Sequence, residues 1–271
     1  MVSIYTFNPE KRSFLGRMSL TNQLILFNLA VFIISLFLLK IYGDEVFLKN
    51  FAITPNLILN FQNLWTFLTS MFVHVSFFHV FANMFSLFFI GNFLERIIGK
   101  KRFFWLYLIS GLIGGIFFVL SGFLFKSNIP GVGASGAIFG LLGILAILVP
   151  FSKIYLIAGP LFAIIANFVL ISFLPQFAST INLIFNIAIL VMIFAMFSWS
   201  SNFRKLAIPV ELPMWLLPIV AIVPLVIIGY FIPLPIGNSA HLGGLVAGLI
   251  YGFYLRKKYP QKIKYISRQF S

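Results

Sequence analysis

Long apolar runs dominate this chain and limit what it can fold into. Several of them reach the roughly 20 residues that a helix needs to cross a bilayer, where a helix satisfies its own backbone hydrogen bonds. Hydrophobic residues make up 61% of the 271 and charged residues only 9%, whereas soluble domains have about 25% charged residues. The chain could not cover itself with a polar surface, so we expect an integral membrane protein built as a helical bundle.

The apolar runs predict about eight membrane spans in an all-α, polytopic bundle. Gly159, Pro160 and Pro175 interrupt the fifth and sixth runs, so the limits of this pair are the least regular. Removing both would leave six spans and would preserve the orientation of the others, because an even number of crossings is lost. The expected spans are residues 22–42, 77–97, 103–123, 135–150, 154–173, 181–199, 213–232 and 239–255.

The basic residues predict the orientation of the bundle. With the N-terminus inside, only Lys49 and Lys126 fall in outside segments, and Lys40 lies near the end of the first span. Cytoplasmic loops of membrane proteins carry such an excess of Lys and Arg, so we expect a plasma-membrane protein with both termini in the cytoplasm. The inside residues are Lys11, Arg12, Arg17, Arg96, Lys100, Lys101, Arg102, Lys153, Arg204, Lys205, Arg256, Lys257, Lys258, Lys262, Lys264 and Arg268.

These limits divide the chain into three parts. We expect a cytoplasmic segment over residues 1–21, a membrane domain over 22–255 and a basic cytoplasmic tail over 256–271. No signal peptide stands out, and polar residues precede the first span. We therefore expect that span to be retained as an anchor.

The net charge of +14 could indicate a nucleic-acid-binding protein, but its distribution argues against one. The basic residues cluster at the ends of apolar runs, where they set orientation and contact anionic lipid. We therefore expect the bilayer, and no nucleic acid, as a partner. The chain has no cysteine, which excludes disulfides, thiolate metal sites and a cysteine nucleophile. We expect neither a metal nor a cofactor.

The connection from about Gly43 to Ser76 is long, and it is apolar for a loop on the outer side. Such a segment is expected to lie in the membrane interface or to dip into the outer leaflet. It could be a packing segment with no chemical role, or it could contribute to substrate access. The sequence leaves both alternatives open.

The second span opens with His74, His79 and Asn83. His79 and Asn83 are four residues apart, so they share one helix face. Ionisable groups at membrane depth are rare and usually functional, and we interpret His79 and Asn83 as part of a site. For His74 we favour a plainer role as a cap at the membrane interface.

A glycine-rich segment, Gly131–Gly140, places Ser135 at the start of the fourth span. The first backbone N–H groups of a helix have no partners inside the helix and can bind a developing anion. A serine hydroxyl in that position is open to nucleophilic chemistry. The alternative is that small residues here only allow close packing of helices.

The last span carries His241 in its first turn and then a glycine at every fourth position from Gly244. Such a stripe lets another backbone approach closely, and the fourth span has a similar pair. If the two stripes meet, Ser135 and His241 would face each other near the outer end of the contact. The glycines are Gly136 and Gly140 in the fourth span and Gly244, Gly248 and Gly252 in the last.

The polar residues of these three spans lie in one expected layer, a short distance below the outer surface. Acyl transfer fits them, because a neutral histidine can take the proton of Ser135. Either His79 or His241 could be the base by residue type, and the glycine stripe favours His241. His79 and Asn83 would then donate toward the oxyanion together with the Ser135 backbone N–H. No carboxylate is expected in this layer, so a Ser–His dyad is implied.

The motifs that carry this chemistry resemble those of the rhomboid family of intramembrane serine proteases. The resemblance covers roughly residues 60–150 and 205–255. It implies a six-span core in which Ser135 is the nucleophile, His241 its base, and His79 and Asn83 the oxyanion-binding pair. The matching motifs are His74-x4-His79-x3-Asn83, Gly133-Ala134-Ser135-Gly136 and Ala240-His241-x2-Gly244-x3-Gly248.

The resemblance extends to the surroundings of these motifs. Trp65 and Glu95 fall where the family has structural residues, and Glu95 is expected to hold a loop or a neighbouring helix end. The connection 43–76 looks like the family's first external loop. The span at 213–232 looks like the helix associated with lateral substrate access.

The chain departs from the family pattern in two places. Thr66 follows Trp65, where many members carry arginine, which puts in doubt how the first loop is pinned. The number of residues between Ser135 and His241 is also large for a six-span core. We interpret the extra length, about 154–199, as an inserted two-helix hairpin, which preserves the orientation of His241.

The resemblance implies an endopeptidase that cuts transmembrane segments of other membrane proteins near the outer interface, where its active site opens. One alternative is a non-catalytic relative that binds membrane clients. Another is a transporter or channel, although transporters usually place their site near the midplane of the bilayer and often show repeated halves.

Overall fold

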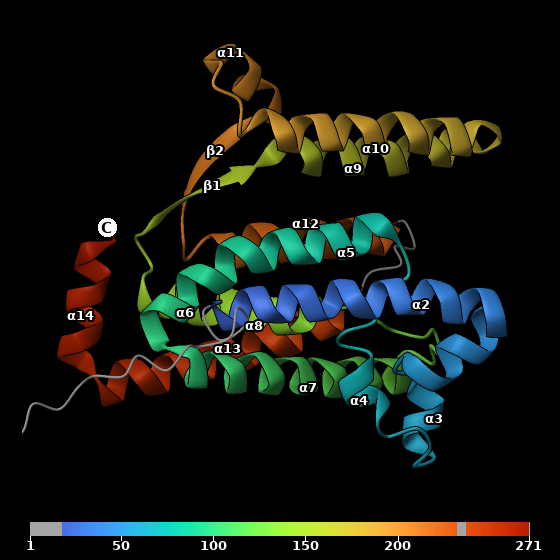
Figure 1. The fold of residues 1–271 in the computed structure, drawn as a ribbon, viewed down its shortest axis with the longest axis horizontal. Coiled ribbons are helices and arrows are strands. Elements are labelled where there is room, and N and C mark those ends of the chain that lie inside the picture. The colour runs from blue at the N-terminus through green and yellow to red at the C-terminus, as the bar shows by residue number, and fades with distance from the viewer. Residues whose placement is uncertain (1–17, 232–236, 271) are drawn as a thin grey trace, which may run out of the picture. The chain divides into compact units, whose positions relative to one another are not determined.

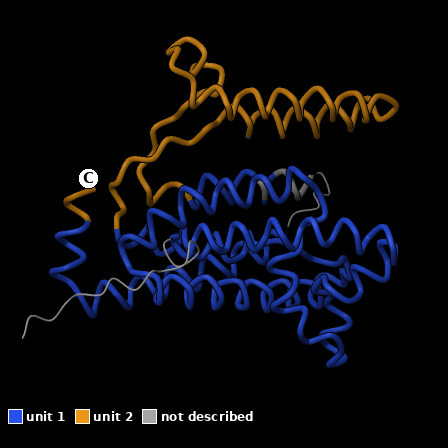
Figure 2. The backbone as a smooth tube through the Cα atoms, in the orientation of Figure 1, with its two compact units in different colours: residues 1–148, 218–266 blue, residues 149–217, 267–271 orange. Residues whose placement is uncertain are grey.

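The computed structural model describes residues 18–231 and 237–270, except for the side chains of residues 161, 225 and 228–231. The chain forms two compact units, which are coloured separately in Figure 2. Unit 1 comprises residues 1–148 and 218–266, and unit 2 comprises residues 149–217 and 267–271. The basic residues expected at the N-terminus, Lys11, Arg12 and Arg17, lie outside the described residues, as does the last residue of the expected span 213–232.

Unit 1 begins with a long helix, α2 (Leu20–Phe51), which Gly43 kinks. Gly43 has φ 76° and ψ 164°, a conformation that is essentially restricted to glycine. The sequence predicted that the first span ends at residue 42 and that a loop follows. Gly43 breaks the helix at that limit, but helical geometry then resumes and continues to Phe51, so the first part of the expected connection is helical. Two short helices, α3 (Pro55–Leu59) and α4 (Thr66–Thr69), follow within the connection.

The expected span 77–97 is a composite helix. It consists of α5 (Phe77–Ser86), a π-helical segment η1 (Leu87–Gly91) and α6 (Asn92–Ile98). The Ser76 hydroxyl caps α5 by accepting a hydrogen bond from the His79 backbone N–H at 3.2 Å, as is usual for an N-cap serine. Gly99 then turns the chain into α7 (Lys100–Leu124).

The centre of unit 1 is α8 (Ser135–Leu148), of which almost every residue is buried. It packs against α7 and against α13 (Asn238–Lys258) (Figure 1). A helix of 14 residues is short for a bilayer crossing, but here its surface is covered by protein. Two further helices are α12 (Leu217–Phe231) and α14 (Pro260–Gln269), so the predicted basic tail is helical.

Unit 2 contains the expected insertion and a strand pair that the sequence reasoning did not foresee. The strands β1 (Lys153–Ile157) and β2 (Pro209–Pro213) pair antiparallel, with Lys153 opposite Pro213. Between them lie the paired helices α9 (Ala158–Phe173) and α10 (Ala178–Ala195). The remaining short elements are η2 (Pro175–Phe177), α11 (Ser201–Arg204) and η3 (Lys205–Ala207).

The strand pair corrects two expectations. The architecture is not purely helical, and the span predicted from residue 154 starts as a strand instead. The sequence Lys-Ile-Tyr-Leu-Ile of β1 is rich in β-branched and aromatic residues, which favour extended structure. The Lys153 ammonium lies 2.6 Å from the Glu211 carboxylate across the pair.

Within residues 18–231 and 237–270, four helices are long and apolar enough to cross a membrane by length and composition. They are Leu20–Phe51, Phe77–Ile98, Lys100–Leu124 and Pro175–Ala195. The chain is therefore a helical membrane protein. Each of the eight expected spans contains a helix, and their number as bilayer crossings stays a prediction.

Candidate active site

The glycine stripes of α8 and α13 meet. A Cβ atom at Gly244 would overlap the carbonyl oxygen of Gly136, and one at Gly248 would overlap that of Gly140. Any side chain at 244 or 248 would therefore force the two backbones apart. The contact expected from the spacing of the glycines is present, and it sets how closely α13 approaches α8.

Ser135 and His241 lie at one end of this contact. The imidazole Nε2 of His241 is 2.8 Å from the Ser135 hydroxyl oxygen. Ser135 is the first residue of α8 and is partly accessible, whereas His241 is buried. The two residues are therefore within hydrogen-bond distance, and Nε2 can accept the hydroxyl proton.

The imidazole of His241 is held by stacking. Its ring lies parallel to that of Phe139, with the centroids 4.4 Å apart and an interplanar angle of 17°. Its Nδ1 has no hydrogen-bond partner among the described residues. Where a catalytic triad has a carboxylate, this site has the face of an aromatic ring. The sequence reasoning did not identify Phe139, although its position one turn after Ser135 on the same helix was a usable signal.

His79 and Asn83 lie beside the backbone that leads into Ser135. A Cβ atom at Gly133 would be 2.6 Å from His79 Nε2 and 3.7 Å from Asn83 Nδ2. Gly133 has φ 120°, a conformation that L side chains rarely adopt, and its N–H donates to the Ser70 carbonyl at 2.8 Å. The four residues predicted to form the site, Ser135, His241, His79 and Asn83, thus converge from α5, α8 and α13.

His74, which we expected to cap the membrane interface, is buried within the protein. Its side chain has no exposed surface, and its ring centroid lies 4.9 Å from that of His79 at an angle of 69°. His74 precedes α5, so no helical periodicity related it to His79. Its position depends on the non-helical residues 70–76 that precede α5.

The first connection is tied to the segment that carries Ser135. The backbones of Ile53 and Gly131 exchange two hydrogen bonds, of 2.9 and 2.8 Å. Local sequence patterns gave no signal for this pairing, because the two residues are far apart in the chain. It fixes the approach of the glycine-rich segment to α8.

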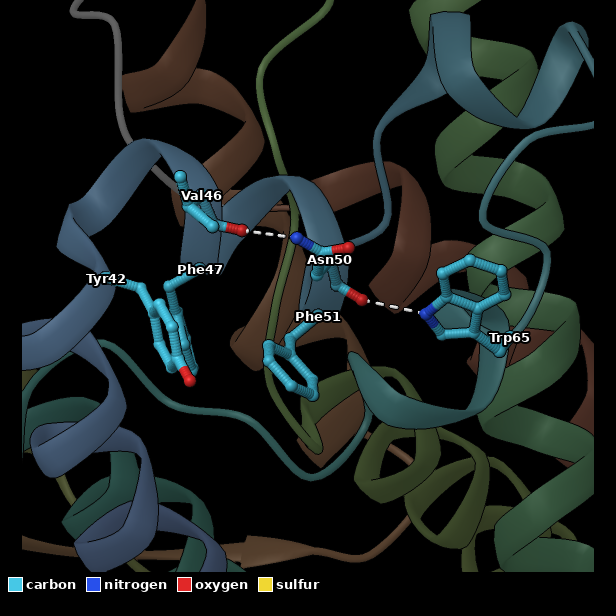
Figure 3. A pocket seen from close by; sticks show the side chains of 6 residues that line it. All are labelled: Tyr42, Val46, Phe47, Asn50, Phe51 and Trp65. Atoms are coloured by element: carbon cyan, nitrogen blue, oxygen red, sulfur yellow. Dashed lines mark hydrogen bonds between the residues drawn. The ribbon is translucent and has the colours of Figure 1, made fainter.

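A small pocket of about 320 Å³ lies where α2 meets this connection. The indole N–H of Trp65 donates to the Asn50 carbonyl at 2.8 Å, as Figure 3 shows. Thr66, which stands where many family members carry arginine, donates only to the nearby Asn63 carbonyl at 2.7 Å. Trp65 thus anchors the connection to α2. The pocket is lined by Tyr42, Val46, Phe47, Asn50, Phe51 and Trp65.

Glu95 holds a neighbouring helix end, as predicted. Its carboxylate accepts hydrogen bonds from the backbone N–H groups of Leu20 and Thr21, at 2.9 and 2.8 Å, and from the Thr21 hydroxyl at 2.7 Å. These groups form the first turn of α2, where a negative charge also interacts favourably with the helix dipole. Glu95 therefore has a structural task, and no described contact places it in the site.

No group of three His, Asp or Glu side chains suited to a metal ion occurs within residues 18–231 and 237–270. The chemistry that this arrangement can perform is that of a serine activated by a histidine. The backbone N–H groups at the start of α8 and the side chains of His79 and Asn83 are available as donors to an anion.

Comparison with known proteins identifies relatives of this chain. The chain is 30% identical over 202 residues to RHOMBOID-like protein 1 of Arabidopsis thaliana, which covers 74% of this chain and 37% of that protein. It is 36% identical over 120 residues to Rhomboid protease GluP of Bacillus subtilis (strain 168), covering 43% and 23%. It is 38% identical over 92 residues to Inactive RHOMBOID-like protein 8 of Arabidopsis thaliana, covering 34% and 24%.

The matched regions span about a quarter to two fifths of the lengths of these relatives. Their names include both a protease and an inactive protein. The model of the Rhomboid domain matches residues 62–190 and 183–258, which include all four residues of the site. A match over so much of the chain, together with a relative that covers most of it, establishes that this protein belongs to the rhomboid family.

Proposed function

We propose that the protein is an intramembrane serine endopeptidase that cleaves transmembrane segments of other membrane proteins near the outer interface. The observation that carries this proposal is the 2.8 Å separation of the Ser135 hydroxyl and His241 Nε2. Its supporting observation is the position of His79 and Asn83 beside Gly133.

In the proposed reaction, His241 Nε2 accepts the Ser135 hydroxyl proton while the oxygen attacks the scissile carbonyl carbon. The resulting oxyanion accepts hydrogen bonds from the Ser135 backbone N–H and from the side chains of His79 and Asn83. The protonated His241 then donates to the leaving amine, and the C–N bond breaks. A water molecule then attacks the carbonyl carbon of the acyl-enzyme while His241 Nε2 accepts one of its protons. The protonated His241 donates this proton to the Ser135 oxygen as the bond between that oxygen and the acyl group breaks.

The Phe139 ring has a defined task in this scheme. A dyad has no carboxylate to orient its base, so the imidazole of His241 must be held in another way. Stacking on Phe139 restricts rotation of the imidazole plane. Aromatic pairs of this kind contribute about 0.5–1.5 kcal/mol beyond area burial, which is enough to favour one ring orientation.

We further propose that the protein lies in the plasma membrane, with cytoplasmic termini and a site that opens outward. The bias of Lys and Arg toward the expected inside segments supports this orientation. Its partners are then transmembrane protein substrates, with anionic lipid at the basic inside segments. Because the chain lacks cysteine, Lys49→Cys and Arg256→Cys each introduce a single thiol, and its labelling reports the orientation of that segment. An impermeant thiol reagent applied to intact cells should label the first and not the second.

The decisive experiment on activity uses a fluorophosphonate probe and a panel of reporter transmembrane segments in liposomes. Wild type should be labelled and should cleave a reporter, whereas Ser135→Ala should do neither and should unfold at the same temperature. Ser110→Ala, which removes another buried hydroxyl in the bundle, is the matched control and should keep both activities. Cleavage retained by Ser135→Ala would refute the proposal.

The second candidate is a non-catalytic protein that binds membrane clients. One relative carries the name of an inactive family member, which is the observation that keeps this candidate. It predicts that wild type is not labelled, that it cleaves no reporter, and that it still co-purifies with membrane clients after Ser135→Ala.

A further inference from the structure

His74 is a buried histidine for which the proposed reaction has no use. A carbonyl oxygen can only accept, so the 3.2 Å contact of Nδ1 with the Phe72 carbonyl places the proton of the neutral ring on Nδ1. Nε2 is then an unprotonated acceptor. It is enclosed, and no described residue forms a hydrogen bond with it.

Packing alone gives little reason for this arrangement. An enclosed polar atom without a partner lowers stability, and a phenylalanine could fill nearly the same volume without that loss. What the ring of His74 does provide is an edge-to-face contact with His79, at 4.9 Å between centroids. Its own orientation is fixed by the bond from Nδ1 to the backbone.

His79 needs such support. No hydrogen bond joins its imidazole to any residue in the described part of the chain, and its side chain is only partly buried. Its Nε2 nevertheless lies next to Gly133, two residues before Ser135. Non-polar contacts with neighbouring groups must therefore hold the ring, and among the described residues His74 supplies the aromatic contact.

We propose that His74 is a positioning residue that sets the ring of His79 for donation toward the oxyanion. This inference rests on the proposed endopeptidase function. It assigns His74 no contact with substrate. Its effect on the reaction passes through His79, so the two residues should be coupled energetically.

The test is a double-mutant cycle of His74→Ala and His79→Ala, read out by fluorophosphonate labelling and by kcat and KM for a reporter segment. His74→Ala should lower kcat about tenfold, as expected for loss of an aromatic pair that orients a group, and should leave KM unchanged. In the His79→Ala background it should have no further effect. His74→Phe keeps an aromatic ring but loses the hydrogen bond from Nδ1 to the Phe72 carbonyl that orients it, so it should restore only part of the rate.

Val73→Ala is the matched control, because Val73 is buried in the same segment. It should lower the unfolding temperature but should combine additively with His79→Ala. If His74→Ala and His79→Ala are also additive, His74 only contributes to packing and the inference is wrong.

A second measurement does not depend on activity. The chain has three histidines, so the ¹⁵N spectrum of histidine-labelled protein in micelles can be assigned by single substitutions. His74→Ala should shift the ring resonances of His79, and Val73→Ala should not. Unshifted His79 resonances would overturn the inference. If His74→Ala shifts these resonances but the wild-type protein neither cleaves reporters nor reacts with the probe, the positioning role is retained and the proposed function is refuted.

Discussion

Gly244→Ala should separate the two helices that bring Ser135 and His241 together. The added Cβ would overlap the Gly136 carbonyl oxygen and would lie 2.8 Å from its carbon. A backbone carbonyl within a helix cannot rotate away as a flexible side chain can. The helix α13 must therefore move away from α8.

The size of the effect follows from ordinary contact distances. A carbon needs about 3.3 Å from a carbonyl oxygen, so the helices must part by about 1 Å or more. The present 2.8 Å between Ser135 and His241 then exceeds hydrogen-bond range. A misplacement of about 1 Å can cost on the order of 100-fold in rate. Overpacking should also remove about 1–3 kcal/mol of stability, offset by about 1 kcal/mol of helix propensity gained over glycine.

The assay compares Gly244→Ala with Gly252→Ala on the same helix. A Cβ at 252 would meet the Cβ of Ile147 at 2.9 Å, a side chain rather than a backbone oxygen, and it lies farther from His241. The rate of fluorophosphonate labelling should fall about 100-fold for the first variant and should stay near wild type for the second. If Gly244→Ala is labelled at the wild-type rate and unfolds at the same temperature, the glycine contact does not set the Ser135–His241 distance.

Three further predictions concern stability and charge. Glu95→Gln should lower the free energy of unfolding by about 1–3 kcal/mol, because its hydrogen bonds to a charged acceptor are replaced by bonds to a neutral one. The control is Glu45→Gln, on the exposed part of α2, which should not change the unfolding temperature. Gly43→Ala should cost about 1–3 kcal/mol through backbone strain alone, since nothing lies within 4 Å of the added Cβ; an unchanged unfolding temperature would contradict the kink. The hydrogen bond from Lys153 lowers the pKa of the exposed Glu211 carboxyl, so an NMR titration should show that Lys153→Ala raises this pKa toward its ordinary value. Because folding lowers the pKa of Glu211, its ion pair with Lys153 stabilises the fold slightly at pH values above the unfolded-state pKa. This stabilisation is lost as the pH falls through the folded-state pKa.

Several features of the site followed from local spacing. The four-residue interval placed His79 and Asn83 on one face of α5, and the glycine interval predicted that α13 could approach α8 closely. Residue spacing shows which side chains share a face of one helix. It does not show which other helix that face contacts. The structural role of Glu95 was likewise predictable, because Glu95 lies at the opposite end of its span from His79.

Other features depended on contacts between distant parts of the chain. The Ile53–Gly131 pairing and the strands β1 and β2 join segments whose local patterns did not indicate each other. The burial of His74 depends on a turn rather than on a helix. The helical segment between Gly43 and Phe51 was not predicted, because the residues after Gly43 were interpreted as part of a long connection.

The strand pair has a topological consequence for the insertion. The Trp215 N–H donates to the Pro150 carbonyl at 3.1 Å, and the Met214 N–H donates to the Ser152 carbonyl at 2.9 Å. The chain therefore leaves and re-enters unit 2 at almost the same point, and joining the two ends directly would close only a very short loop. The insertion could therefore be shortened, lengthened or removed without separating the two points at which it joins the rest of the chain.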